Sequence, residues 1–193
     1  MIITNNQFVF ETEARTAISR PGLEDLLKWL TTTDFYSAPC SGRYHGSHEG
    51  GLVEHSLTVY QQFWNIAPRF GYDASDSLLL EESAIVCLFH DLCKVNFYEP
   101  YIRNVKNPDT GIWEQVQEFR AKGATKLASH GACSCFRVMR FMQLTEMEYA
   151  AILHHMGAWD KSQYSNPGEV YSNNKLAWLL HVADEAATYI EGC

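Results

Sequence analysis

The sequence predicts an all-α helical bundle with a small two-stranded β-hairpin inserted near residues 98–120. Three observations favour this fold. Several segments repeat apolar residues at a spacing of three and four, one segment is apolar nearly all round, and one places strong turn residues between two β-prone runs. The chain of 193 residues suffices for one sizeable core and is short for two. We therefore expect one globular unit, in which residues 1–36 form an N-terminal helical extension packed on a domain of residues 37–193.

The helices are predicted mainly from apolar periodicity. Residues 1–20 are ambiguous, but the leucines of GLEDLLKWL, which begins at Gly22, form a clean apolar stripe. The segment SLLLEESAIVCLFHDLCK is apolar nearly all round, which is typical of a buried helix. Loops rich in Gly, Ser, Asn or Pro are expected over 37–51 and 157–174. Further helices are predicted over 52–67, 77–94, 127–142, 145–155 and 175–190.

The predicted hairpin departs from helical periodicity. Its centre, Asn107-Pro108-Asp109-Thr110-Gly111, has strong turn chemistry. The flanking runs YIRNV and IWEQVQEF are enriched in β-branched and aromatic residues. We therefore expect a two-stranded ribbon that projects from the helical body.

Composition limits the class of partner and the compartment. The formal charge of −8, from 15 basic and 23 acidic residues, argues against strong nucleic-acid binding, which needs clustered Lys and Arg. A small phosphorylated substrate remains compatible, because a bound metal reverses the local sign of charge. The six cysteines have no CxxC spacing, and no segment resembles a secretory signal or a membrane span of roughly 20 apolar residues. We expect a cytoplasmic protein with reduced thiols and no membrane partner.

The positions of the histidines point to a metal site. Each of these residues, taken alone, is best explained as a helix cap or as a core histidine bonded to the backbone. Five predicted helices, however, each carry a metal-competent residue, mostly near one end and on a core-facing stretch. Imidazole and carboxylate together are ligands for divalent first-row metals that activate water. The residues are His55, His90, Asp91, His130, His154, His155 and Asp184.

These residues lie in recognisable motifs: GGLVEHS contains His55, FHDLCK contains His90 and Asp91, and LLHVADEA contains Asp184. SHG and HHMG, which lie between them, supply the remaining histidines. Over roughly residues 38–190 the chain resembles the HD-domain superfamily of metal-dependent phosphohydrolases. It is similar to the HD domains of bacterial 3′–5′ exoribonucleases and, more distantly, to HD-type dinucleoside polyphosphate hydrolases.

The resemblance implies one or two divalent ions, namely Mn, Fe, Co, Ni or Zn. Asp91 would bridge the first ion to a second one completed by His130 and one histidine of the HHMG motif. His155 is preferred over His154, because the family's histidine at this position is commonly followed by one residue and then Gly. The first ion would be bound by His55, His90, Asp91 and Asp184.

Asp91 and Lys94 are the predicted catalytic residues. A carboxylate can bridge ions or accept the proton of a water molecule, and the family often has a Lys at the position of Lys94 that contacts the substrate phosphate. Lys94 is also compatible with an exposed charge favoured by the helix dipole. The family often has a small residue where this chain has Cys93, and that change leaves Lys94 in register.

Other polar residues are predicted around this site. Arg43, His45 and His48 lie in the loop before the GGLVEHS motif, either at the pocket mouth, where loops contact substrate, or in a solvated polar loop. His154 would contact substrate, support a ligand or simply pack. His181 lies one turn before Asp184, so it is predicted to support a ligand by a hydrogen bond, with a core histidine as the alternative.

The predicted function is hydrolysis of a phosphate ester or anhydride, most plausibly of a nucleotide or similar small molecule. The exoribonuclease relatives have a separate nucleic-acid-binding domain for which this chain has no room, so a small substrate is favoured over RNA. Two alternatives remain open. One is an HD-fold di-iron oxygenase with the same ligand order, and the other is a non-catalytic nucleotide-binding HD module.

Overall fold

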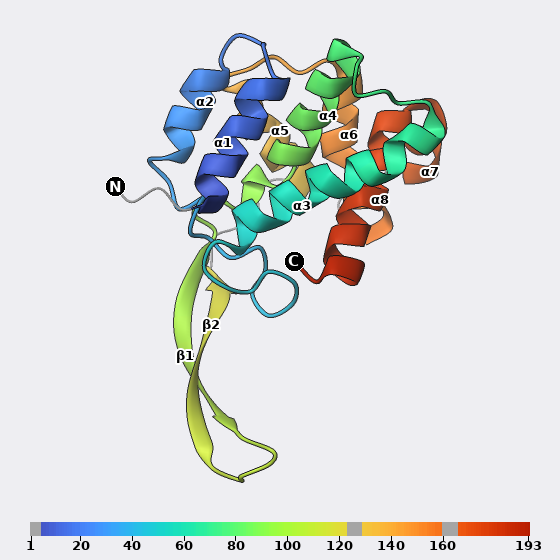
Figure 1. Ribbon diagram of the computed structural model, residues 1–193. Helices are drawn as coiled ribbons and strands as arrows, with labels where there is room; N and C mark the ends of the chain where they lie inside the picture. Colours follow the sequence, from blue (N-terminus) through green and yellow to red (C-terminus); the bar gives the residue numbers. More distant parts are fainter. Residues whose placement is uncertain (1–4, 123–128, 160–165) are drawn as a thin grey trace.

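A computed structural model describes residues 5–122, 129–159 and 166–193. Its described residues form a helical body from which a two-stranded antiparallel hairpin projects (Figure 1). This confirms the predicted helical bundle with a hairpin insertion. The α-helices are α1 Asn5–Ala17, α2 Leu23–Leu30, α3 Gly51–Ile66, α4 Ser77–Phe89, α5 His130–Met139, α6 Glu146–His154, α7 Pro167–Asn173 and α8 Lys175–Ala186. Short helical turns are η1 Ala67–Phe70, η2 Leu92–Lys94, η3 Gly157–Trp159 and η4 Ala187–Glu191, and the strands are β1 Tyr98–Lys106 and β2 Trp113–Ala121.

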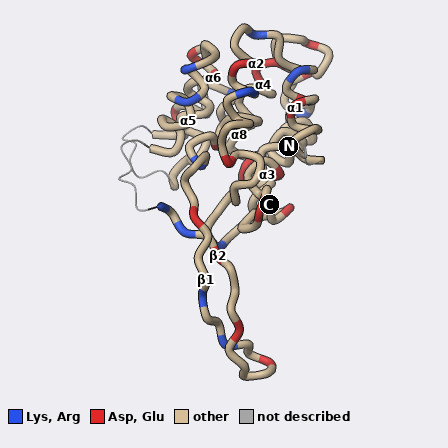
Figure 2. The backbone as a smooth tube through the Cα atoms, turned by 90° about the vertical axis from the view of Figure 1, so that its left-hand side faces the viewer, with Lys and Arg blue, Asp and Glu red and all other residues tan. Residues whose placement is uncertain are grey.

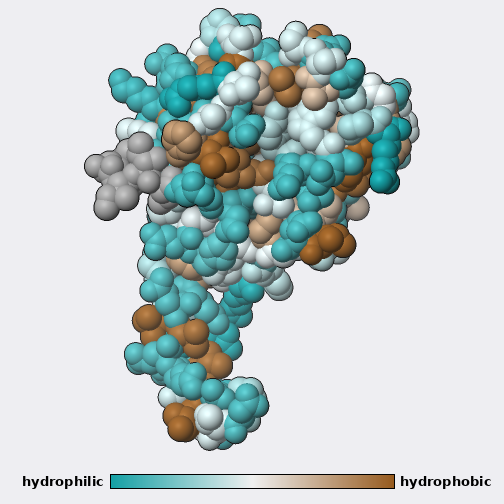
Figure 3. Space-filling view, in the orientation of Figure 1, coloured by the Kyte–Doolittle hydropathy of each residue, from teal (hydrophilic) through white to brown (hydrophobic). Residues whose placement is uncertain are grey.

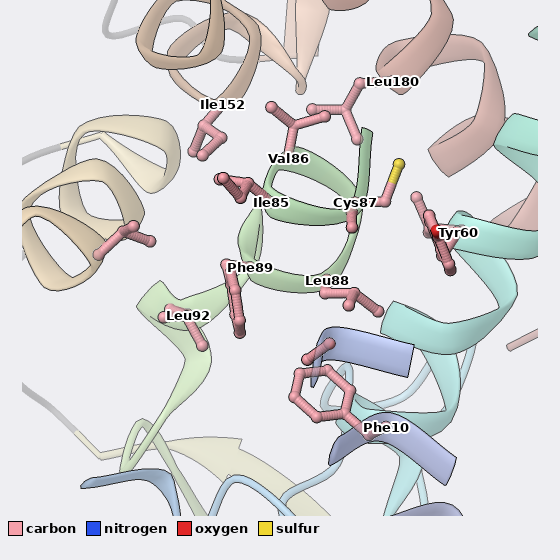
Figure 4. Close-up of a cluster of buried hydrophobic side chains, with 14 of the residues drawn as sticks. Phe10, Tyr60, Ile85, Val86, Cys87, Leu88, Phe89, Leu92, Ile152 and Leu180 are labelled. Atoms are coloured by element: carbon pink, nitrogen blue, oxygen red, sulfur yellow. The ribbon is translucent and has the colours of Figure 1, made fainter. Parts of the chain in front are cut away.

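Helix α4 runs through the centre of the core. The Asp76 carboxylate starts it by accepting hydrogen bonds from the first backbone N–H groups, and every residue from Ser83 to Phe89 is buried. Figure 4 shows its apolar side chains pointing towards several neighbours, with Phe10 of α1 below and Leu180 of α8 above. A helix enclosed in this way needs no polar face, which explains its nearly uniform apolar sequence.

The first twenty residues, which are ambiguous in sequence, contain helix α1. Its Phe10 and Ala14 are fully buried, and the Phe10 ring meets Phe35 edge-on at 5.0 Å and Phe89 at 5.9 Å. The described part of the N-terminal segment therefore packs on the same core as α4. The domain boundary at residue 36 stays a prediction.

Two predicted element boundaries were wrong. The helix expected over 77–94 ends at Phe89, and a separate 3₁₀ turn follows at Leu92–Lys94 because Asp91 (φ −106°, ψ 20°) leaves the helical conformation. The loop expected over 157–174 contains α7, which the Asn166 cap and Pro167 start in the usual way for a helix N-terminus. Residues 127–128 of a predicted helix and 160–165 of this loop lie outside the described residues.

The hairpin pairs Tyr98 with Ala121 at its root and Lys106 with Trp113 near its tip. Charged residues of both signs occur along its strands (Figure 2), and apolar side chains such as Ile102 lie open to solvent on it (Figure 3). At the root, the Arg43 guanidinium donates to the Tyr101 hydroxyl at 2.9 Å. The loop before α3 therefore lies directly against the hairpin.

All six cysteines are unpaired thiols, and five of them are buried. This agrees with the predicted absence of a disulfide framework. Within the described ranges, no helix combines the length and the apolar character that a bilayer crossing requires.

Candidate metal centre

Four helices bring histidine and aspartate side chains together in one buried cluster. His55 comes from α3, His90 and Asp91 directly follow α4, His155 follows α6, and Asp184 comes from α8. None of the five is more than 9% exposed. His55 Nε2 lies 3.1 Å from Asp184 Oδ1, His90 Nε2 lies 3.5 Å from Asp91 Oδ2, and His155 Nε2 lies 3.6 Å from Asp91 Oδ1.

The three buried imidazoles are anchored in the same way. His55 Nδ1 lies 2.9 Å from the Cys193 carbonyl oxygen, and His90 and His155 each bond through Nδ1 to the carbonyl three residues earlier, at 2.8 and 2.6 Å. A carbonyl only accepts, so Nδ1 carries the proton, and each ring in its neutral form presents an Nε2 lone pair. All three Nε2 atoms are buried without a hydrogen-bond partner. Anchoring of one ring nitrogen while the other faces carboxylates is the usual arrangement of metal-binding histidines.

The spacing of these atoms fits a metal ion. The ligand atoms of His55, His90 and Asp91 lie within 4.8 Å of one another, and so do those of His90, His155 and Asp184. Ligands about 2.0–2.2 Å from one ion lie within roughly 4.4 Å of each other, so small adjustments suffice. Orphaned buried polar atoms are costly, and coordination would satisfy all three at once. The residues present therefore fit a divalent metal.

The carboxylates at the centre are ionised. Burial raises the pKa of Asp91, but the Lys94 ammonium and the His90 ring outweigh it and hold that pKa well below its usual range. Burial also raises the pKa of Asp184, and the adjacent His55 and His90 rings reverse the effect, so that this pKa too is lowered. The cluster thus concentrates negative charge in a buried place, which favours a cation.

Lys94 is buried rather than exposed, so its interpretation as a solvated helix-end charge is wrong. Its Nζ lies 2.6 Å from Asp91 Oδ2 and 3.3 Å from Cys40 Sγ. Burial lowers the Lys94 pKa, but the Asp91 carboxylate and the Cys40 thiol raise it well above its usual value. Burial raises the pKa of Cys40, whereas Lys94 and His55 lower it, with a net value of about 5. The neighbouring Lys94 and His55 thus favour the thiolate form of Cys40.

His130 also lies close to Asp91. One ligand atom each of Asp91, Cys93 and His130 falls within 4.8 Å of the others, and the Cys93 sulfur is 3.1 Å from His130 Nδ1. The close approach of α5 and α6 makes this possible, because a Cβ on Gly131 would lie 2.2 Å from the Leu153 carbonyl oxygen. The start of α5, which carries His130, and the end of α6, which precedes His155, therefore both lie beside Asp91.

Of the adjacent histidines, His155 is the one whose Nε2 faces Asp91. The His154 backbone carbonyl accepts a hydrogen bond from the Tyr171 hydroxyl at 2.9 Å. His181 Nδ1 lies 2.7 Å from the His155 carbonyl oxygen, and its ring stacks on Tyr171. His181 therefore supports the backbone of a candidate ligand.

The structure does not bring Arg43 or His48 into the cluster. Arg43 pairs with Glu118 of the hairpin at 3.3 Å, and His48 lies 3.3 Å from Glu54 with 56% of its side chain exposed. Their predicted contact with substrate stays a prediction. The loop histidine that does approach the cluster is His45, whose ring centre is 5.3 Å from that of His55.

Sequence reasoning missed the two thiols at the centre. Cys40 lies fifteen residues before His55 in an irregular loop, where helical periodicity gives no information about side-chain direction. The position of Cys93 between Asp91 and Lys94 could have indicated that it belongs to the site. From the sequence alone it is interpreted only as a replacement of a small residue that leaves Lys94 in register. Both sulfurs lie within hydrogen-bonding reach of predicted site residues.

Comparison with known proteins found no matching family model, no matching curated protein and no matching solved structure. A functional assignment therefore depends on the geometry of the cluster and on the sequence motifs that form it.

Proposed function

We propose that this protein is a metal-dependent phosphohydrolase of the HD type, acting on a phosphate ester or anhydride of a nucleotide or similar small molecule. The observation that supports it is the set of three buried histidines, each anchored through Nδ1, whose unpartnered Nε2 atoms face two carboxylates. The order of these residues in the chain matches the HD motifs. When bound, a divalent ion lowers the pKa of a coordinated water molecule and neutralises charge on phosphoryl oxygens.

Asp91 is the central residue of the proposed mechanism. Its Oδ2 faces Lys94, His90 and His55, whereas its Oδ1 faces His155. The carboxylate can therefore serve two neighbouring ions or accept a proton from a water molecule. Its lowered pKa keeps it ionised for either role.

Lys94 is proposed to bind the substrate phosphate. Its ammonium is held at the cluster by Asp91, with 10% of the side chain exposed. A cation placed beside the reacting phosphoryl group stabilises the negative charge of the transition state. The lysine stem reaches the centre from the 3₁₀ turn after α4, and Arg137 fixes this turn by donating to the carbonyls of Leu92 and Val95.

The proposal is tested by phosphate or nucleoside release from phosphomonoesters, phosphodiesters and nucleotides, each screened with Mn²⁺, Co²⁺, Ni²⁺, Fe²⁺ and Zn²⁺. Wild type should hydrolyse at least one class only with metal, and His90→Gln should be inactive while still folded. His48→Gln, an exposed histidine, is the matched control and should retain activity. Lys94→Met should mainly raise KM. Hydrolysis that continues in His90→Gln would place the activity elsewhere.

A further inference from the structure

We propose that Cys40 supplies a thiolate ligand to the same ion that His55 binds. The centre would then combine nitrogen, oxygen and sulfur donors, and would select a borderline-soft ion such as Zn²⁺ or Co²⁺ over Mg²⁺. The HD motifs supply only histidine and aspartate, so a cysteine ligand goes beyond the ligand set of the proposed function. The inference rests on the metal centre of the proposed function but not on its hydrolytic activity.

Cys40, His45 and His55 form a group of their own beside the carboxylates. One ligand atom of each lies within 4.8 Å of the other two, and Cys40 is completely buried. His55 can offer only Nε2, because its Nδ1 is bonded to the Cys193 carbonyl. That same Nε2 lies 3.1 Å from Asp184 Oδ1. An ion on His55 Nε2 would therefore be within reach of the Asp184 carboxylate, and the Cys40 sulfur lies within 4.8 Å of a ring nitrogen of the same imidazole.

The Lys94 ammonium shows where sulfur and carboxylate converge. Its Nζ lies 3.3 Å from Cys40 Sγ and 2.6 Å from Asp91 Oδ2. A sulfur and a carboxylate from distant parts of the chain thus converge on the same ammonium, which places the Cys40 sulfur near a carboxylate of the metal centre. A thiol that served only to fill space would not need to point at a charged group.

The backbone around Cys40 fixes the direction of its side chain. Gly46 has φ +54°, and its carbonyl oxygen accepts a hydrogen bond from the Cys40 N–H at 2.8 Å. A Cβ on Gly46 would lie 2.7 Å from Cys40 Cβ, and a Cβ on Gly51 would lie 2.0 Å from the Gly46 carbonyl oxygen. Only glycine fits at both positions, so the loop is held tightly against the start of α3. The sulfur is presented to His55 by a rigid loop.

The test is a Co²⁺ titration followed by absorption. Wild type should develop an intense sulfur-to-cobalt charge-transfer band in the near ultraviolet. Cys40→Ser should lose this band and bind Co²⁺ at least about tenfold more weakly. Cys135→Ser is the control and should keep the band, because it removes a buried thiol whose sulfur contacts the Tyr149 carbonyl. The band should also survive in Cys93→Ser, which would exclude the sulfur beside His130 as its source.

A wild-type protein that is saturated with Co²⁺ but shows no such band, or a band that persists in Cys40→Ser, would overturn the inference. If Cys40→Ser does not fold, X-ray absorption of the Co²⁺-loaded Cys93→Ser protein decides. A sulfur at about 2.3 Å supports Cys40 as ligand, and a shell of only nitrogen and oxygen overturns it. A sulfur-to-cobalt band without any hydrolysis would support Cys40 as a ligand and contradict the proposed phosphohydrolase activity. Hydrolysis without the band would support that activity and contradict Cys40 as a ligand.

Discussion

Two charged clusters lie at opposite ends of α4 and α6, one partly buried and one buried, and they are completed differently. Near the helix starts, Arg20 reaches Glu81 of α4 and Glu148 of α6, at 3.1 and 2.6 Å. At the helix ends, Asp91 and His155 belong to the candidate metal centre. The first cluster pairs its carboxylates with Arg20 and leaves one buried oxygen, Glu148 Oε1, without a hydrogen-bond partner. The second contains Lys94 and still presents three unpartnered imidazole nitrogens to two carboxylates.

The helix dipole explains why the two ends differ. Glu148 lies in the first turn of α6, where the partial positive charge of the helix start favours a carboxylate, and Arg20 compensates what remains. Asp91 lies just past the C-terminal end of α4, where the dipole disfavours an anion and favours a cation. Lys94 supplies one positive charge at this end. We infer that a structural ion network pairs its carboxylates with a cation of the chain, whereas a binding centre also leaves several imidazole nitrogens for an ion from solution.

The largest expected effect on function is that of Asp91→Asn, which would test the metal centre. Binding of a divalent ion at about 100 times its dissociation constant should raise the free energy of unfolding of wild type by about 2.7 kcal/mol. Asp91→Asn removes the shared carboxylate, so this stabilisation and the hydrolysis should both disappear. Denaturant unfolding with and without Co²⁺ measures it. Asp109→Asn, in the exposed hairpin turn, should behave as wild type, and an equally stabilised Asp91→Asn would contradict the assignment.

Arg20→Met would remove the cation of the Arg20 cluster, which lies near the starts of α4 and α6. Glu148 is fully buried, so removal of its partner leaves an uncompensated charge and should lower the free energy of unfolding by about 3 kcal/mol. Stabilisation by Co²⁺ should remain as in wild type, because the metal centre is intact. Arg15→Met is the matched control: Arg15 is 45% exposed and pairs with Glu11 and Glu24, so its loss should cost less than about 1 kcal/mol. A loss of metal binding in Arg20→Met would mean that the two clusters are coupled.

Much of the fold was predictable because it depends on local periodicity and turn chemistry. The leucine stripe of α2, the uniformly apolar α4 and the Asn107–Gly111 turn each encode their own conformation. Helix α1 was not predictable, because its apolar face is irregular and is defined by the aromatic residues that cover it. The end of α4 at Phe89 was missed for a similar reason: carbonyls beyond it are bonded by Arg137, which lies more than forty residues away.

The histidines and aspartates of the centre were predictable because their order in the chain follows a known set of motifs. The contributions of Cys40 and His45 were not, because a loop held by Gly46 and Gly51 determines where they point. The contact of Arg43 with the hairpin likewise depends on Tyr101 and on tertiary packing.

A smaller effect is expected from His130→Ala, which would sharpen the comparison inside the metal centre. His130 forms a possible metal group with Asp91 and Cys93, separate from the group of His55, His90 and Asp91. Its loss should therefore remove only the more weakly bound of the two predicted ions. At about ten times the dissociation constant of that ion, the lost stabilisation would be about 1.4 kcal/mol. Calorimetric titration should show two classes of site in wild type and one in the variant. His48→Ala is the control, and a single class in wild type would contradict the two-metal prediction.

The smallest expected effect concerns the response of the Arg20 cluster to acid. Burial raises the pKa of Glu81, but hydrogen bonds from the Ser19 N–H and from Arg20 outweigh it, so the pKa in the folded protein is lowered. A carboxyl whose pKa is lower when folded stabilises the fold above its unfolded pKa of about 4.3. This contribution is lost as the pH falls through the folded value. Wild type should therefore lose stability between neutral pH and about pH 3.5 partly through Glu81.

Glu81→Gln isolates that contribution, because a glutamine side chain does not titrate. The variant should be slightly less stable than wild type at neutral pH, and the difference should shrink in acid as the wild-type carboxylate becomes protonated. Denaturant unfolding at both pH values measures it. Glu24→Gln is the matched control, since the Glu24 side chain is 68% exposed and its pairing with Arg15 is open to solvent. A difference between Glu81→Gln and wild type that stays constant with pH would show that the ionised carboxylate is not what closes this cluster.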